Sequence, residues 1–188
     1  MLDAAADAGV TNFVYPSIVG IDEIPYSYYE AKLAAERAIA DSEVAHTILR
    51  ATQFHEFLAD IFGTISWLPV WPLPTRMELQ PIAVGEVADV LVENALAAPQ
   101  GRMAPIAGPE VHTLGELART YLDATGRRRP VVRLPIPTAT FDAFRDGNAT
   151  RPDRAVGTER FAAWLDGAGG ESTGPEADTG TNPQADAT

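Results

Sequence analysis

The chain has 188 residues and a mass of 20.1 kDa, with 46% hydrophobic residues, enough for one globular domain with a core. Its 26 acidic residues outnumber its 14 basic ones, and the net charge of −12 excludes a broad nucleic-acid-binding or anionic-membrane-binding surface. The lack of cysteine excludes disulfides and thiolate metal sites, and no metal site is expected.

The first half of the chain alternates between helical and extended patterns. Ser27 and Glu30 have the spacing of a capping box, which predicts a helix with Ser27 as its N-cap. The expected elements are a helix at residues 1–8, a strand at 11–15, a helix at 27–41, a strand at 46–50 and a helix at 54–62.

The second half continues the alternation. Thr113 is the expected cap of one helix and Gly126 its stop signal. The expected elements are a proline- and tryptophan-rich loop at 67–74 that cannot be regular throughout, a helix at 85–97, a strand at 103–107, a helix at 113–125, a strand at 131–134 and short helices at 137–147 and 158–165. Strands that alternate with helices predict an α/β fold with a mostly parallel sheet.

The C-terminal end differs in composition from the rest of the chain. Residues 167–188 contain no apolar residue larger than alanine, and they carry four acids and no base. Such a segment cannot bury enough apolar surface to offset the entropy of ordering. We expect one domain at residues 1–166 and a disordered acidic tail at 167–188.

The pair Tyr28 and Lys32 is the sharpest chemical feature of the sequence. Residues four apart on a helix lie on one face, so both side chains can act on the same substrate atom. An ammonium close to a phenol stabilises the phenolate, which allows the tyrosine to transfer a proton. Lys32 is the single lysine among the 14 basic residues. The alternative is an ordinary tyrosine and lysine on a solvated helix face.

Ser17 is a second candidate, because it follows the strand expected at residues 11–15. Doubly wound sheets bind their ligands at the carboxyl ends of strands, where a serine hydroxyl can hold a carbonyl oxygen. A serine after a strand is also a common turn residue, so this assignment depends on Tyr28 and Lys32.

Four segments together resemble the NmrA-like branch of the atypical short-chain dehydrogenase/reductases. They read NFVYPSIVGID, YYEAKLAAERAIADSEVAHTILRATQFHEFL, QPIAVGEVADVLVENAL and IAGPEVHTLGELARTYLDATGRRRPVVRLP. The resemblance covers nearly all of residues 1–165. It implies the C-terminal part of a Rossmann-type doubly wound parallel sheet with a small C-terminal α/β substrate lobe. It also implies an NAD(P) cofactor and a small-molecule substrate.

The resemblance assigns roles to particular residues of this chain. Ser17, Tyr28 and Lys32 occupy the positions of the family's catalytic Ser-Tyr-Lys set. The implied cofactor contacts are Lys32, Thr52 and Gln53, and the implied substrate-binding residues are Phe54, His55, Trp67 and Trp71. The loop from Trp67 to Trp71 is equally open to a purely packing role, and structural roles are open to the three histidines.

One feature of this family is missing from the sequence. Its members begin with a strand and a glycine-rich G-x-x-G-x-x-G turn that holds the cofactor's pyrophosphate. No such turn occurs in this chain. We therefore expect an N-terminally incomplete, truncated chain that lacks the cradle for NAD(P). The strand at 11–15 would then be an unpaired sheet edge that permits self-association.

Three functions follow from these observations. The first is an NAD(P)-dependent oxidoreductase of the NmrA-like type. The second is a non-catalytic regulatory protein that senses dinucleotides, and the third is an inactive fragment. In each case we expect a cytoplasmic protein, because the sequence shows no signal peptide and no membrane-spanning stretch. We also expect no nucleic-acid partner and no membrane partner.

Overall fold

The computed structural model describes residues 1–168, so most of the expected tail, residues 169–188, lies outside the described part. Residues 167 and 168 still belong to the last helix, which extends into the segment expected as tail. The helices are α1 (Leu2–Asp7), α2 (Ser27–Ala40), α3 (His55–Thr64), α4 (Val84–Leu96), α5 (Leu114–Ala124), α6 (Ala139–Arg145), the 3-10 helix η1 (Pro152–Arg154) and α7 (Phe161–Ala168). The strands are β1 (Phe13–Ile18), β2 (His46–Ala51), β3 (Trp71–Leu73), β4 (Glu78–Leu79), β5 (Gly101–Arg102), β6 (His112–Thr113) and β7 (Val131–Arg133).

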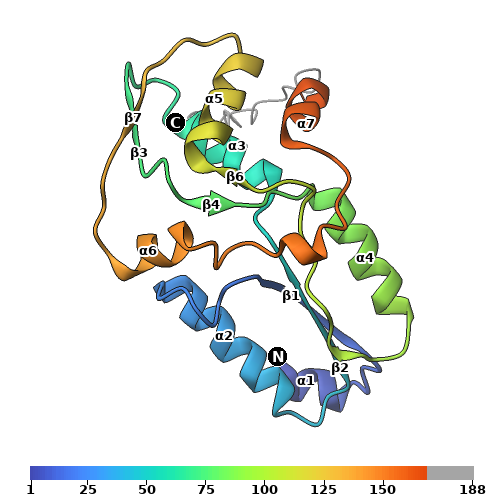
Figure 1. Ribbon diagram of the computed structural model, residues 1–188. Coiled ribbons are helices and arrows are strands. Elements are labelled where there is room, and N and C mark those ends of the chain that lie inside the picture. Colours follow the sequence, from blue (N-terminus) through green and yellow to red (C-terminus); the bar gives the residue numbers. More distant parts are fainter. Residues whose placement is uncertain (169–188) are drawn as a thin grey trace, which may run out of the picture.

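The main sheet has three parallel strands in the order β1-β2-β5, with β1 at an edge (Figure 1). Successive side chains of a strand point to opposite faces of the sheet. Arg50 of β2 lies on the face covered by α2, whereas its neighbours Leu49 and Ala51 pack with Val87 of α4 on the other face. The parallel sheet between helices confirms the expected α/β class and its Rossmann-type arrangement.

Two further strand pairs build a lobe beside this sheet. The strand expected at residues 131–134 is confirmed as β7, which pairs in parallel with β3. β3 covers three residues of the proline-rich segment 67–74, and residues 67–70 of that segment are irregular. β4 and β6 form the second pair, which is antiparallel.

The third strand of the main sheet is also shorter than expected. β5 covers two residues, and the expected strand at 103–107 is reduced to two isolated bridges, from Ile106 to Ala51 and from Ala107 to Ala155.

The larger hydrophobic core belongs to the lobe and not to the sheet. It joins side chains of α3, α5, α7, β3 and α6, and its largest fully buried members are Trp71 and Phe62, whose rings stack at 5.6 Å. A smaller core of Leu49, Ile82 and Val87, with Ala51 and Ile106, fills the space between the sheet and α4. The main sheet therefore packs against the smaller of the two hydrophobic cores.

The expected capping box at Ser27 is not formed. The backbone N–H of Glu30 bonds to the carbonyl of Tyr26, so Tyr26 is the N-cap and Ser27 is already helical, with no side-chain cap. By contrast, Thr113 caps α5 as expected and forms a capping box with Glu116. Gly126 stops this helix with a φ of 65°, a conformation that favours glycine.

Candidate functional site

Tyr28 and Lys32 lie on one face of α2, as their spacing predicts, and this face is directed toward β1. Lys32 Nζ donates a hydrogen bond to the carbonyl of Pro16 at 2.8 Å and lies 4.2 Å from the centre of the Tyr15 ring. Tyr28 lies one turn earlier, in the first turn of α2, and is 54% exposed. The lysine is therefore fixed on the edge strand, while the phenol of Tyr28 is open to solvent.

The carbonyl that Lys32 contacts points away from the sheet. The amide groups of Phe13 and Val19 bond toward β2, to Ala45 and Ala51, so the alternate residue Pro16 directs its carbonyl to the free side of β1. Proline also lacks an N–H group, which removes one donor from the same side. The hydrogen bond from Lys32 thus gives a partner to one carbonyl group of the unpaired edge strand. The single lysine therefore has a structural role in addition to any chemical one.

Ser17 lies within β1, not after it, because the strand extends to Ile18. Its register partner is Arg50, so its side chain lies on the face covered by α2. The Oγ atom is buried and has no hydrogen bond of ordinary geometry among residues 1–168, but it faces Glu36 and helps to lower the pKa of that carboxyl. The structure brings Ser17 next to the Lys32 anchor but covers the hydroxyl that the resemblance assigns to a substrate carbonyl.

A network of four charged side chains lies beneath α2. Glu36, which is completely buried, accepts hydrogen bonds from Arg50 at 2.8 and 2.7 Å and contacts Arg102 at 3.1 Å. Arg50 also pairs with Asp22, in the turn that follows β1. The charges of the two acids and the two bases cancel, which allows Glu36 to remain ionised although it is buried. The network connects α2 to β2, to β5 and to the turn after β1.

The network sets the ionisation of its carboxylates. Burial alone would raise the pKa of Glu36, but the hydrogen bonds and charge of Arg50 outweigh it and hold that pKa below its ordinary value. The pKa of Asp22 is also lowered, chiefly by its hydrogen bond from Arg50. Sequence reasoning missed these residues, and the only available signal was Glu36 four residues after Lys32 on the same helix face.

Thr52 and Gln53 follow the carboxyl end of β2, beside the end of β1. Thr52 Oγ1 accepts a hydrogen bond from the backbone of Gly108 at 3.2 Å, so this hydroxyl already has a partner. Gln53 Nε2 contacts the carbonyl of Ala149 at 3.5 Å, and Gln53 Oε1 is buried without a partner in the described chain. Both side chains hold the lobe against the sheet in this structure.

The four expected substrate-binding residues do not come together. Phe54 is partly buried against the core beneath α4, and Trp67 is 76% exposed on the surface. Trp71 is instead completely buried in the lobe core, because β3 directs it against Phe62 and Tyr121.

His55 is also completely buried, at the start of α3. Its Nε2 donates to the carbonyl of Glu159 at 3.0 Å, and its ring packs against Phe161 and Trp164. Burial lowers the pKa of His55, so the neutral ring is favoured. This residue fixes α7 to α3 and does not line an open pocket.

The described residues fit only part of an NAD(P) molecule. Lys32 Nζ has three donors and spends one on Pro16, which leaves two for hydroxyl groups such as those of a ribose. The buried, unpartnered Gln53 Oε1 marks a polar place at the same ends of β1 and β2. For the pyrophosphate, however, residues 1–168 provide no glycine-rich turn between a strand and a helix. The adenosine and pyrophosphate half has no cradle in this part of the chain.

Comparison with solved structures identifies the architecture. The chain superimposes on the NADPH-dependent quinone oxidoreductase QOR2 of Escherichia coli with a TM-score of 0.70, 18% identity, and coverage of 88% of this chain and 70% of that one. The NADPH complex of the same enzyme gives a TM-score of 0.73, 17% identity and coverage of 88% and 68%. The triphenylmethane reductase of Citrobacter sp., complexed with NADP(H), gives a TM-score of 0.67 and 17% identity, with coverage of 89% of this chain and 68% of that one.

The chain shares the Rossmann-type fold of these solved structures. At identities of 17–18% the likeness shows the fold alone. No family model matches the sequence, and no curated protein matches it either. Among the described helices, none is both long and apolar enough to cross a membrane.

Proposed function

We propose that this chain carries the Tyr-Lys part of an NAD(P)-dependent oxidoreductase of the NmrA-like type. One observation carries the proposal: Lys32 Nζ is fixed on the carbonyl of Pro16, at the edge strand of a Rossmann-type sheet, one helical turn from the exposed Tyr28. Two solved structures that share the fold are named as NADPH-dependent or NADP(H)-bound reductases, which supports the same cofactor class here.

Within this proposal the two side chains have distinct tasks. Tyr28 donates or accepts a proton at a substrate oxygen, because its phenol is open to solvent in the first turn of α2. Lys32 contributes its two remaining donors to the ribose hydroxyls and its charge to the phenolate. A bound NAD(P) supplies the hydride. Ser17 is given no substrate contact, because its Oγ is covered.

We also propose that the pyrophosphate-binding half of the cofactor site is contributed by polypeptide beyond these residues. The free side of β1 supports this, since within residues 1–168 no strand pairs there. The solved structures are longer, and the chain spans 68–70% of their lengths. Residues 1–166 would then be the part of a Rossmann-like domain that bears the substrate lobe.

The decisive experiment begins with the DNA upstream of the Met1 codon. An in-frame strand followed by G-x-x-G-x-x-G would support the proposal, and the extended chain should then oxidise NADPH with a quinone acceptor. Tyr28→Phe in that chain should lower kcat by about 100-fold or more, the range typical of a lost general acid. Tyr26→Phe is the matched control, because Tyr26 is a neighbouring tyrosine with 48% exposure. Equal activity of the Tyr28→Phe variant and the wild type contradicts the assignment.

A second function is favoured by the covered hydroxyl of Ser17. A serine that cannot reach a substrate leaves the Ser-Tyr-Lys set incomplete, as expected of a regulatory protein that binds a dinucleotide without turnover. In that case Tyr28→Phe leaves the dissociation constant for NADPH unchanged, and the extended chain binds NADPH without oxidising it. An inactive fragment is supported if no such in-frame segment lies upstream of the Met1 codon and the chain of 188 residues does not bind NADPH.

A further inference from the structure

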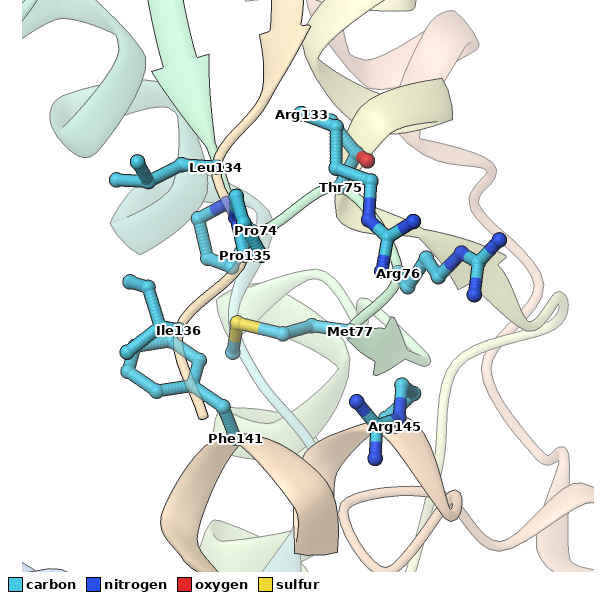
Figure 2. A pocket seen from close by; sticks show the side chains of 10 residues that line it. All are labelled: Pro74, Thr75, Arg76, Met77, Arg133, Leu134, Pro135, Ile136, Phe141 and Arg145. Carbon is cyan, nitrogen blue, oxygen red and sulfur yellow. The ribbon is translucent and has the colours of Figure 1, made fainter. Parts of the chain in front are cut away.

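A small pocket in the lobe has one cationic wall and one apolar wall (Figure 2). It opens where β3 and β7 end, between the Pro74–Met77 turn and α6. The cationic wall consists of the side chains of Arg76, Arg133 and Arg145. The apolar wall consists of Leu134, Ile136 and Phe141, with Met77 extending across the space between the two walls.

The three arginines carry more positive charge than their neighbours cancel. Arg145 pairs with Asp142 at 2.7 Å on the same helix. Arg76 and Arg133 form no ion pair with any residue of the described chain. They come from different segments of a protein whose net charge is −12, so their convergence is not a by-product of a generally basic surface. Guanidinium groups bind carboxylates and phosphates through paired hydrogen bonds.

The floor of the pocket is fixed before any ligand arrives. The Pro74–Met77 turn is closed by a hydrogen bond from the Met77 amide to the Pro74 carbonyl at 3.1 Å. The carbonyls of Thr75 and Met77 in turn accept hydrogen bonds from Gly115 and Leu114, at the start of α5. A preformed floor lowers the entropy cost of binding.

The position also agrees with a general property of parallel strands. β3 and β7 run parallel, and most of the pocket residues lie at the carboxyl ends of these strands or directly after them. The carboxyl ends of parallel strands are where α/β proteins place their ligand sites. The space inside the pocket that solvent can occupy is about 30 Å³, which encloses no more than a small head group, so the body of an occupant must rest on the open surface beside it.

We propose that this pocket binds a small organic anion: a phosphate or carboxylate group held by Arg76 and Arg133, with an apolar body resting on Leu134, Ile136 and Phe141. The site is separate from Tyr28 and Lys32, and binding there needs neither NAD(P) nor catalysis. The helix α6 that borders the pocket also contacts α2, because the ring centres of Phe144 and Tyr29 lie 6.2 Å apart.

The test uses the full chain with 13C-labelled methionine methyl groups and phenyl phosphate as the probe. The chain has three methionines, and Met77 is the one that lines the pocket. Titration should shift the Met77 methyl signal saturably and leave those of Met1 and Met103 in place. Binding should weaken as salt is raised, because the contact is ionic. Met77→Leu assigns the signal.

Substitutions and partial ligands separate the two walls. The double variant Arg76→Ala, Arg133→Ala should weaken phenyl phosphate binding at least tenfold, with the Met1 and Met103 signals unchanged as evidence of intact folding. Arg129→Ala, which removes a charge outside this pocket, should leave binding as it is. Inorganic phosphate and benzyl alcohol, each with half of the required chemistry, should both bind more weakly than phenyl phosphate.

Comparison of benzoate with phenyl phosphate identifies the preferred anionic group, and tight binding of either supports the proposal. It is overturned if neither probe shifts Met77 saturably. It is also overturned if Arg129→Ala weakens binding as much as the pocket variant, because attraction would then be general. The proposal is likewise overturned if phenyl phosphate still shifts the Met77 signal in the double variant Arg76→Ala, Arg133→Ala.

Discussion

Arg50 donates two hydrogen bonds to Glu36, a carboxylate that is completely buried between the sheet and α2. The pair joins the helix that carries Tyr28 and Lys32 to the central strand of the sheet. This polar connection lies on the face of the sheet opposite the one that packs against α4 through the smaller hydrophobic core.

Glu36→Gln should therefore destabilise the protein by about 3 kcal/mol, the lower end of the range for breaking a buried ion pair, because Asp22 still pairs with Arg50. The measurement is the free energy of unfolding from urea denaturation. Glu30→Gln, on the same helix but exposed, is the control and should change stability by less than about 0.5 kcal/mol. Equal effects of the two variants would show that the network contributes nothing.

Stability should fall as the solution is acidified, and the network explains part of the slope. The pKa values of Asp22 and Glu36 are lowered in the folded state, so this state binds fewer protons than the unfolded chain. Their contribution is fully present above the ordinary carboxyl values of 3.8 and 4.5 and is lost as the pH falls through the lower folded values. His55 also makes stability fall on acidification, beginning below its ordinary pKa of 6.5, because burial lowers the pKa of this residue in the folded state. Urea midpoints between pH 7 and pH 3 should decrease, and more gently for Glu36→Gln than for the wild type.

Lys32→Met should increase self-association. The substitution removes the donor that satisfies the Pro16 carbonyl and removes a charge from the free side of β1, two features that protect edge strands from pairing. Sedimentation velocity at several concentrations should show a larger share of dimers and higher oligomers than in the wild type. Tyr28→Met changes a neighbouring exposed residue without touching the edge, and it should leave the distribution unaltered. Identical sedimentation of all three proteins would mean that this edge does not associate.

Two glycines should respond in opposite ways to alanine. A Cβ at Gly108 would overlap the carbonyl of Pro81, so Gly108→Ala should cost about 3 kcal/mol by overpacking. Gly85 lies in α4 with open space around it, and Gly85→Ala should stabilise the protein by about 0.5 kcal/mol through helix propensity. Thermal melts of the two variants distinguish them. A neutral Gly108→Ala would mean that the contact between residues 81 and 108 is looser than the structure shows.

Local patterns in the sequence predicted most elements and the Tyr28–Lys32 face. Both depend on spacing along one helix or strand, and the cap at Thr113 with its stop at Gly126 is of the same kind. The short strand β3 within the segment 67–74 was not predicted, because it contains a proline and is a strand only through its pairing with β7, about 60 residues away. Trp71 then enters the core, where short-range reasoning could not place it.

The charged network and the cationic pocket escaped prediction for a related reason. Glu36 and Arg50 meet because of how α2 packs across β2, and Arg102 reaches them from β5. Arg76, Arg133 and Arg145 converge from three segments with no shared motif. Such sites depend on which segments pack together in the folded protein, and this packing cannot be predicted from local patterns in a single sequence.

The turn that connects β1 to α2 is folded with the lobe: Ile21, Ile24 and Tyr29 belong to the lobe core, and Thr140 of α6 bonds to the carbonyl of Pro25. α2 therefore contacts both bodies, the lobe through Tyr29 and the edge strand through the bond from Lys32 to Pro16. Loosening of the lobe against the sheet would keep the helical spacing of Tyr28 and Lys32 but shift α2 relative to β1, so a mutation far from either residue could displace the pair from the sheet edge without unfolding the protein.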